Sequence, residues 1–363
     1  MAFFIYHIKM LIEQGHQVDL ACSIHKPISD NLIKMGCGVY EIPFSRKPIA
    51  KGNILAIIIL KNLIADKHYD IIHTHTPNAS AYVRWSLRKM NKIKIFYTAH
   101  GFHFYKGAPT FNWLLYYPIE RWLSRYTDVL ITINKEDYAI AKKFKAGRVE
   151  YIPGVGLDTQ KFIDHTTGRI QIRKELDISD NAIVLLSVGE INKNKNHQII
   201  IKALSKLMDM NIFYVIVGSG SKKRLDKLSN SLGISTQIRI IGWKKNVDDY
   251  YNAADIFCFP SRREGLGLAA LEAMASGLPI ITSNIHGICD YSQNGVTGFM
   301  VSYNDYIGFA ESIKLLSSNE ELRKVMGTHN QKIVKGFDTQ VSVERIREIY
   351  KNTFDKLKLG VNI

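Results

Sequence analysis

The stretch SRREGLGLAALEAMASGLPII, residues 261–281, decides the fold. It follows an apolar, strand-like run at residues 256–259 and turns through a glycine-containing loop at residues 264–267. A helix pattern over residues 268–275 comes next, and a glycine and a proline then give the expected stop signals. A second strand-like run covers residues 280–282. The order of strand, loop, helix and strand predicts a βαβ unit, and open α/β sheets bind ligands at loops after the carboxyl ends of strands.

The loop of this unit has the chemistry of a site for an anionic ligand that also carries hydroxyl groups. Gly265 and Gly267 let the backbone approach a ligand closely, and free N–H groups at the helix start favour an anion such as phosphate. Glu264 in the loop and Glu272 in the helix would repel phosphate, so they suit the hydroxyls of a sugar or a ribose. Two glutamates at this spacing also occur by chance in helices, so the pair alone does not decide the function.

The whole string E-G-L-G-L-x-x-x-E-A-M-A-S-G-L-P-I-I resembles the nucleotide-sugar site of the family-4 retaining glycosyltransferases. This resemblance implies the α/β GT-B fold, in which two Rossmann-like domains with doubly wound parallel sheets face a cleft. It implies that Glu264 contacts the donor sugar and that Glu272 contacts the ribose. By the same resemblance, Gly265 and Leu266 offer backbone N–H groups to the sugar and the diphosphate, with Gly267 beside them.

The length of 363 residues predicts two domains. We expect an N-terminal acceptor-side domain at residues 1–160 and a nucleotide-sugar-binding domain at residues 161–340, with a hinge region over residues 154–180. The resemblance implies that a last helix within residues 341–363 packs back on the first domain. Four scattered cysteines without a C-x-x-C pair argue against a zinc site or a disulfide framework and fit a reducing cytoplasm.

The net charge of +15 is concentrated in the first half, where residues 1–160 hold 21 Lys and Arg against 12 Asp and Glu. Nucleic acid or an anionic membrane surface could bind such a chain. No nucleic-acid-binding motif stands out, so we favour a membrane surface over nucleic acid, and a merely solvated basic surface stays open. The longest aliphatic run, residues 54–60, is far shorter than the about 20 residues of a membrane-spanning helix.

The chain begins in an unusual way, with a helix pattern at residues 3–14 and a strand pattern at residues 17–22. A doubly wound domain normally starts with a strand and a glycine-rich turn before this helix, and family members usually carry both. Without that central strand, its neighbours would have unpaired edges. The hypothesis is that Met1 is not the natural start, or that the gene is truncated.

The first domain offers histidines at the ends of two strands. His73 and His75 lie at the end of the strand at residues 69–74 and alternate faces there, so a shared metal ion is not expected. His100 follows the strand at residues 93–98, and the resemblance implies that it contacts the donor sugar; the alternative is a satisfied loop histidine.

An aromatic loop at residues 102–117 precedes a helix that we expect at residues 118–126. It is either core beneath a helix or a contact for a lipid-linked acceptor or the bilayer interface.

The second domain contains a further phosphate-type loop between a strand at residues 183–188 and a helix that begins at His197. By resemblance, Lys195 binds the donor diphosphate. Glu190 stands where many family members have an arginine, and we expect Lys193 to compensate for that lost cation. Trp243, after a later strand, would meet the nucleotide base.

We therefore predict a hexosyltransferase that moves a sugar from a nucleotide-sugar, most simply a UDP-sugar, to a lipid-linked or saccharide acceptor with retention of configuration. His100, Glu264 and Lys195 are the predicted catalytic residues. The D-x-D metal motif is absent from the sequence, so we expect neither a metal nor a cofactor besides the nucleotide-sugar co-substrate. The expected role is capsule or exopolysaccharide assembly, in the cytoplasm and at the inner face of the plasma membrane.

Other readings remain open. The chain could be a non-catalytic nucleotide-sugar-binding GT-B protein that lacks its first strand, and turnover would separate this reading from the enzyme. A GT-B UDP-sugar epimerase shares the fold but is disfavoured by the string GLGLAALEAMASG. A phosphorylase would need a lysine context for pyridoxal phosphate that the sequence does not offer.

Overall fold

The computed structural model describes residues 4–24, 27–45, 47, 50–162 and 166–358. It divides into two compact units. Unit 1 comprises Met1–Gly156 together with Thr339–Ile363, and unit 2 comprises Leu157–Asp338. The break after Gly156 lies four residues before the boundary expected at residue 160. Two parts of the expected elements lie outside the described residues: residue 3, where the first helix was expected to begin, and the tail at 359–363.

Unit 2 is built on a six-stranded parallel sheet in the order β12-β11-β10-β7-β8-β9. Its strands are β7 (Ile183–Val188), β8 (Ile212–Val217), β9 (Ile238–Gly242), β10 (Ile256–Phe259), β11 (Ile280–Ser283) and β12 (Gly298–Val301). The chain adds strands outward from β7 in one direction and outward from β10 in the other. The neighbours β7 and β10 therefore form the topological switch point, the place where open α/β sheets bind ligands.

Seven helices of unit 2 are described: α7 (Thr166–Glu175), α8 (Gln198–Leu204), α9 (Lys223–Ser231), α10 (Asp248–Ala253), α11 (Leu268–Ala275), α12 (Tyr306–Ser318) and α13 (Glu320–Ile333). The core joins alternate strand residues such as Leu185 and Tyr214 with Ile200 of α8 and Ile313 of α12, all fully buried. β7 is a continuous apolar run because both faces of a parallel strand are covered.

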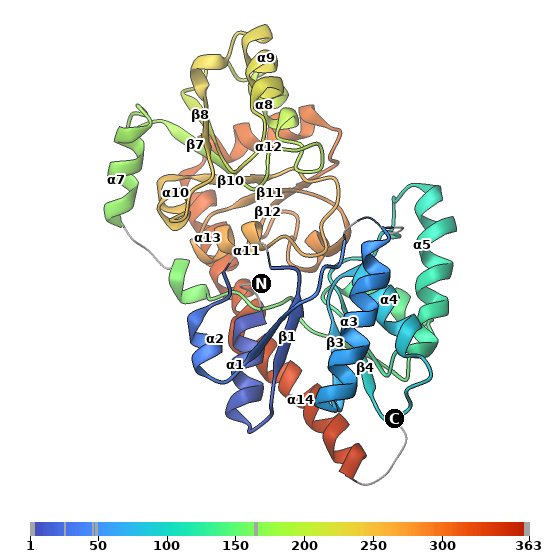
Figure 1. The fold of residues 1–363 in the computed structure, drawn as a ribbon. Helices are drawn as coiled ribbons and strands as arrows, with labels where there is room; N and C mark the ends of the chain where they lie inside the picture. The colour runs from blue at the N-terminus through green and yellow to red at the C-terminus, as the bar shows by residue number, and fades with distance from the viewer. Residues whose placement is uncertain (1–3, 25–26, 46, 48–49, 163–165, 359–363) are drawn as a thin grey trace. The chain divides into compact units, whose positions relative to one another are not determined.

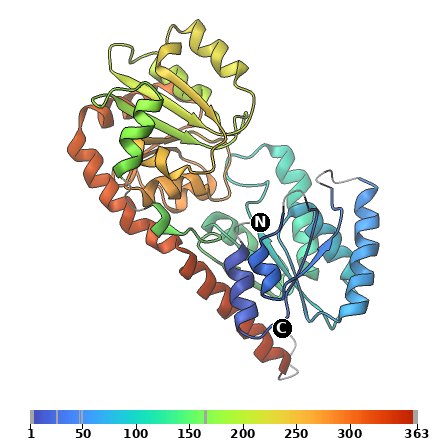
Figure 2. The same ribbon diagram turned by 60° about the vertical axis from the view of Figure 1, so that its left-hand side comes forward.

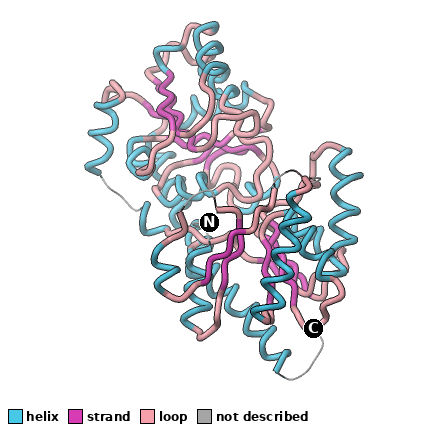
Figure 3. The backbone as a smooth tube through the Cα atoms, viewed as in Figure 1, coloured by secondary structure: helices cyan, strands magenta, loops and turns pink. Residues whose placement is uncertain are grey.

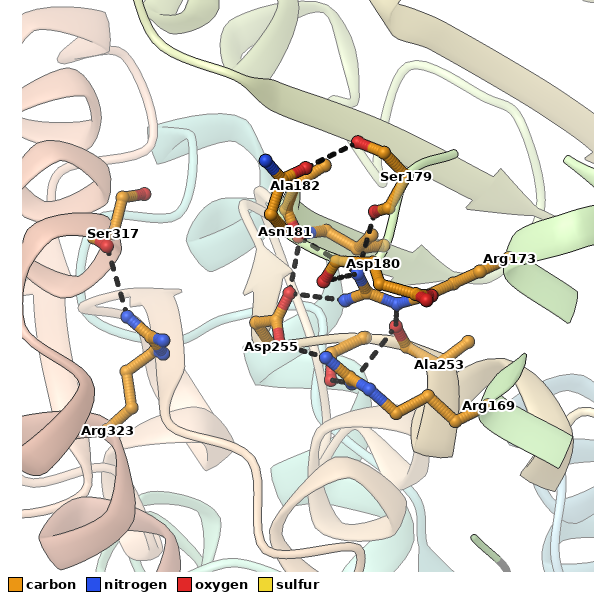
Figure 4. Close-up of polar contacts among 12 residues, drawn as sticks. Arg169, Arg173, Ser179, Asp180, Asn181, Ala182, Ala253, Asp255, Ser317 and Arg323 are labelled. Carbon is orange, nitrogen blue, oxygen red and sulfur yellow. Dashed lines mark hydrogen bonds and ion pairs between the residues drawn. The ribbon is translucent and has the colours of Figure 1, made fainter. Parts of the chain in front are cut away.

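The residues expected to form a hinge, 154–180, contain α7, which packs on α10 within unit 2. Figure 4 shows how this helix is held. Asp255, just before β10, accepts hydrogen bonds from Arg169 at 2.8 Å and from Arg173 at 2.7 Å. It also accepts the backbone N–H of Val184 at 2.7 Å. Arg173 is almost fully buried and donates to several backbone carbonyls besides, so its charge is paired and its donors are used.

Unit 1 contains two separate parallel sheets, which Figure 3 draws as two groups of strands. The small sheet pairs β1 (Asp19–Cys22) with β2 (Gly38–Glu41), and the larger one has the order β3-β4-β5-β6, with β3 (Ile71–Thr74), β4 (Lys94–Ala99), β5 (Val129–Thr132) and β6 (Arg148–Tyr151). Among the described residues, β1 pairs only with β2 and β3 only with β4. Among these residues the two sheets of unit 1 are therefore not joined by strand pairing.

The described helices of unit 1 are α1 (Ile5–Glu13), α2 (Asp30–Lys34), α3 (Gly52–Lys67), α4 (Pro77–Leu87), α5 (Thr110–Leu123), α6 (Lys135–Ala141) and α14 (Thr339–Lys358). In Figures 1 and 2, α14 runs beside α1, and the two helices are in contact. Arg148 on β6 donates to the carbonyl oxygen of Ile349 on α14 at 3.0 Å. The C-terminal helix is therefore part of unit 1. None of the helices in the described residues is both long and apolar enough to cross a membrane.

The helix expected at residues 118–126 was placed wrongly, because α5 begins at Thr110 and contains Pro118. Proline removes one backbone donor from a helix interior, but the inward side of α5 packs Trp113 and Tyr117 against Phe104, and this packing outweighs the loss. Phe102 and Phe104 are buried, so the first part of the aromatic loop is core.

Candidate active site

Two loops meet at the switch point of the unit 2 sheet. One follows β7 and carries Lys195, and the other follows β10 and carries Glu264. Because β7 and β10 are paired in parallel, their carboxyl ends lie side by side. The Nζ of Lys195 lies 2.7 Å from Oε1 of Glu264, and it also lies 4.7 Å from the centre of the Phe259 ring. Two predicted catalytic residues, 69 positions apart in the sequence, thus form a partly buried ion pair.

Backbone and amide contacts fix the two loops to each other. The N–H of Arg262 donates to the carbonyl oxygen of Asn194 at 2.8 Å, and the amide of Asn194 donates to the carbonyl oxygen of Arg263 at 2.9 Å. Asn196 is buried, has a φ of 58° and donates to the carbonyl oxygen of Pro260 at 3.1 Å. The sequence motifs did not indicate a role for Asn196. A residue type that tolerates the left-handed backbone better than most, at this point of the loop, could have indicated it.

Glycines shape the loop before α11. Gly267 caps the helix with a φ of 91°, and a Cβ there would lie 2.6 Å from the Phe259 ring. A Cβ on Gly287 would lie only 1.9 Å from the carbonyl oxygen of Gly265. Leu266 is buried and its carbonyl oxygen accepts the hydroxyl of Tyr291 at 2.9 Å. This rigid loop ends at the start of α11, where the first-turn N–H groups have no partner within the helix.

Glu272 lies on α11 and has a partner that the sequence did not reveal. The hydroxyl of Tyr251 on α10 donates to Oε2 of Glu272 at 2.7 Å and to the carbonyl oxygen of Ala269 at 3.0 Å. Burial raises the pKa of Glu272, and the hydrogen bond from Tyr251 opposes that rise. The two residues are 21 positions apart in the sequence, so no local sequence pattern could have indicated that they are in contact.

The remaining predicted donor-binding side chains are exposed. Lys193 lies in the loop after β7, and Trp243, 68% exposed, follows β9. Glu190 is exposed as well, and its carboxylate accepts the amide of Asn192 at 3.0 Å. Their roles toward a ligand stay predictions.

His100 lies in unit 1, directly after β4, within a group of partly buried histidines. Its Nε2 is 3.4 Å from Nδ1 of His75. The ring of His73 is joined by hydrogen bonds to Thr98 at 2.8 Å and to Tyr350 of α14 at 2.9 Å. Burial lowers the pKa of His100 to about 4. His100 is therefore uncharged near neutral pH and acts as a hydrogen-bonding group, not as a cation.

The expectation that His73 and His75 point to opposite faces was wrong, because their ring centroids are only 4.2 Å apart. The reason is that successive residues of a strand alternate faces, so residues two positions apart, such as His73 and His75, share one face. In the part of the chain that the structure describes, no group of three His, Cys, Asp or Glu side chains is placed to hold a metal ion.

Comparisons with known proteins cover nearly the whole chain. The model of the family "Glycosyltransferase Family 4" matches residues 3–161, and the model "Glycosyl transferases group 1" matches residues 168–333. The EpsD protein of Bacillus subtilis (strain 168), which is named as a glycosyltransferase, is 33% identical over 98% of this chain and 94% of its own length. A UDP-Gal:alpha-D-GlcNAc-diphosphoundecaprenol alpha-1,3-galactosyltransferase of Escherichia coli is 26% identical over 95% of this chain and 92% of its own length.

A solved structure with the same fold is that of Anabaena Alr3699/HepE in complex with UDP and glucose. It is 17% identical, its TM-score is 0.80, and the match covers 97% of this chain and 96% of that chain. This likeness confirms the predicted fold, two α/β domains with parallel sheets. With the matching family models and the relative from Bacillus subtilis, it follows that the chain belongs to the family-4 glycosyltransferases of the GT-B fold and is a hexosyltransferase.

Proposed function

We propose that this glycosyltransferase transfers a sugar from a UDP-sugar to a lipid-linked saccharide with retention of configuration, in the assembly of a cell-surface polysaccharide. The observation that carries the proposal is the ion pair between Lys195 and Glu264 at the switch point of the unit 2 sheet. A cation and a carboxylate held side by side suit a ligand whose diphosphate and sugar hydroxyls are neighbours. The relative from Escherichia coli is named for a UDP-sugar donor and a diphosphoundecaprenol-linked acceptor, which supports both choices.

In the proposed reaction, the acceptor hydroxyl attacks the anomeric carbon from the side on which the diphosphate leaves. The new C–O bond forms as the bond to the diphosphate breaks, and the electron pair leaves with the diphosphate oxygen, which takes up the hydroxyl proton. Lys195 and the start of α11 supply positive potential where that negative charge develops. Because the ammonium of Lys195 has three donors, it can hold Glu264 and a phosphate oxygen together.

The two glutamates take the uncharged parts of the donor. Glu264 orients the sugar hydroxyls, and Glu272 accepts from the ribose hydroxyls, each as a two-oxygen acceptor. His100 assists from unit 1 as a neutral group. Gly265, Leu266 and Gly267 offer backbone groups, and Lys193 and Trp243 add charge and a base contact. In this proposal neither a metal ion nor another cofactor takes part.

The proposal is tested by donor binding and turnover with a panel of UDP-sugars. A Glu264→Gln variant is expected to turn over its donor about tenfold to a hundredfold more slowly, as for the loss of one hydrogen bond to a charged group. UDP itself, which lacks the sugar, should bind to the Glu264→Gln variant almost as tightly as to the wild type. Glu311→Gln, which changes an exposed glutamate of α12 outside these loops, is the matched control and should behave like the wild type.

If the folded protein binds none of the UDP-sugars, the donor assignment is wrong. Binding without any transfer or hydrolysis would instead favour the non-catalytic reading. Retention is checked by the anomeric configuration of the product.

A Tyr251→Phe variant removes the hydroxyl that bonds to Glu272 and to the carbonyl oxygen of Ala269, and it should weaken donor binding through Glu272. The hydroxyl of Tyr251 lowers the pKa of Glu272 against the effect of burial, so its loss raises that pKa further. The carboxylate then becomes protonated, and donor binding falls, at a higher pH than in the wild type. We expect the donor KM to rise about tenfold, with the acid limb of its pH profile moved upward. A pH profile identical to that of the wild type would contradict a role for Glu272.

A further inference from the structure

The outward side of α5 in unit 1 is apolar along its whole length. Phe111 is 64% exposed, Leu114 is 73% exposed and Ile119 is 43% exposed. The exposed apolar residues of the helix, which we call the α5 face, are Phe111, Leu114, Leu115, Pro118, Ile119 and Trp122. They recur every three or four positions, so they share one side of the helix. A surface helix normally turns polar residues outward, and an exposed apolar patch of this kind marks an interaction site.

Aromatic side chains continue the α5 face onto α4, on which α5 packs (Figure 1). The ring centroids of Trp122 and Trp85 are 4.8 Å apart, and Tyr126 packs against both rings. The guanidinium of Arg88 lies 3.5 Å from the centre of the Trp85 ring. Tryptophan and tyrosine are the side chains that gather where an apolar layer meets water, because each has an apolar body and a polar group.

The charged residues near α5 in the sequence are mostly basic, although one of them, Lys94, is paired with Asp128. Residues 71–127 contain eight Lys and Arg and a single acidic residue, Glu120. That one carboxylate is buried and is paired with the buried Arg84 at 2.9 Å, so it does not offset the surface charge. Arg121 and Arg125 are exposed at the C-terminal end of α5. An apolar stripe with an aromatic edge and exposed arginines beside it is complementary to an anionic lipid surface.

We propose that α5 docks unit 1 on an anionic phospholipid bilayer, with Phe111, Leu114 and Trp122 in the interfacial layer. Arg88, Arg121 and Arg125 would contact phosphate groups of the lipids. Membrane docking extends the proposed function, because a membrane-bound protein meets a lipid-linked acceptor directly. Docking itself needs neither donor nor acceptor, so it can be tested in the absence of both.

The test is flotation of the full-length protein with phosphatidylcholine vesicles that contain or lack phosphatidylglycerol, at low and high salt. The wild type should float with the anionic vesicles, and salt should weaken binding because it screens the exposed arginines. A Phe111→Ser/Leu114→Ser variant should bind these vesicles at least about tenfold more weakly. Arg121→Gln should reduce binding about fivefold, and only on anionic vesicles.

The matched control is Ile307→Ser/Leu315→Ser, which removes two similarly exposed apolar side chains from α12 of unit 2 and should float like the wild type. All changes lie on exposed positions, and unchanged UDP-sugar binding by the Phe111→Ser/Leu114→Ser variant will show that its donor site is intact. The inference is overturned if the wild type does not float at low salt, or if the α5 variant floats like the wild type. It is also overturned if the wild type is a dimer that stays off vesicles and that the α5 variant dissociates, because the face would then bind a second copy.

Discussion

A Lys195→Met variant is expected to transfer sugar about a hundredfold to a thousandfold more slowly than the wild type, the usual loss when one group that stabilises transition-state charge is removed. The charge on the departing diphosphate grows as the bond to the sugar breaks, so the ammonium at the switch point acts mainly in the transition state. The loss should therefore appear in kcat more than in the donor KM. Steady-state kinetics with the donor identified from the panel measures this division.

Lys193→Met is the matched control, since Lys193 lies on the same loop and is exposed. The loss of sugar transfer in Lys193→Met should be smaller than in Lys195→Met and should appear mainly in the donor KM, because an exposed cation contributes to donor binding in a diffuse way.

The double variant Lys195→Met/Glu264→Gln tests the ion pair, because removing Lys195 alone leaves Glu264 as an unpaired carboxylate beside the diphosphate. The double variant should be impaired by less than the product of the two single losses. Equal losses at both lysines would contradict a specific role for Lys195.

Unit 1 is expected to lose much of its stability between about pH 6.5 and pH 4. Burial lowers the pKa of His7 and His100 to about 4 and that of His73 to about 3, and burial also holds the pKa of His75 well below 6.5. In the unfolded chain a histidine takes up its proton near about pH 6.5. Below that pH the unfolded state binds more protons than the folded state, so acid favours unfolding.

The size of this effect follows from the pKa values. Each histidine whose pKa falls to about 4 on folding costs about 3 kcal/mol by the time the pH reaches 4. His7 and His100 together then cost about 6 kcal/mol, which is comparable with the whole stability of many domains. The hydroxyl partners of two of these rings carry no charge at these pH values: Ser342 bonds to His7, and Thr98 and Tyr350 bond to His73.

Urea unfolding at several pH values measures the effect. A Trp243→Phe background leaves the three tryptophans of unit 1 as the fluorescent probes. His7→Leu should lessen the dependence of the unfolding free energy on pH by up to about 1.4 kcal/mol per pH unit. His329→Gln, which removes an exposed histidine of α13, should leave the dependence unchanged. A stability that is flat from pH 7 to pH 4 would contradict the prediction.

The sequence predicted best where one local signal controls the structure. The bounds of β7, β10 and α11 agree with the expected ones, because a buried parallel strand needs an unbroken apolar run and the helix stop has both glycine and proline. The start of α5 was misjudged because Pro118 suits a first turn, whereas here tertiary packing holds it in the helix interior. A helix was therefore expected in this region, but its proline lies in the interior and does not mark its start.

The candidate site was predictable as a set of loops but not as a set of contacts. The sequence indicated Lys195 and Glu264 separately, and only the pairing of β7 with β10 places them 2.7 Å apart. The bond between Tyr251 and Glu272 depends on how α10 packs beside α11, which no spacing in the sequence expresses. The contact between His73 and His75, in contrast, follows from the two-residue period of a strand, which places residues two positions apart on one face.

The carboxylate of Asp255 also determines how this protein can be divided for experiments. A fragment that starts at residue 181 would contain the whole six-stranded sheet, but it would lack Arg169 and Arg173, the two cations that neutralise this carboxylate. A fragment that spans residues 157–338 keeps them, and it also keeps the hydrogen bond from Thr159 to Asp338 at 2.6 Å, which ties its two ends together. The smallest fragment that keeps these contacts is therefore set by α7 and by the hydrogen bond between Thr159 and Asp338, and it begins well before the first strand of its sheet.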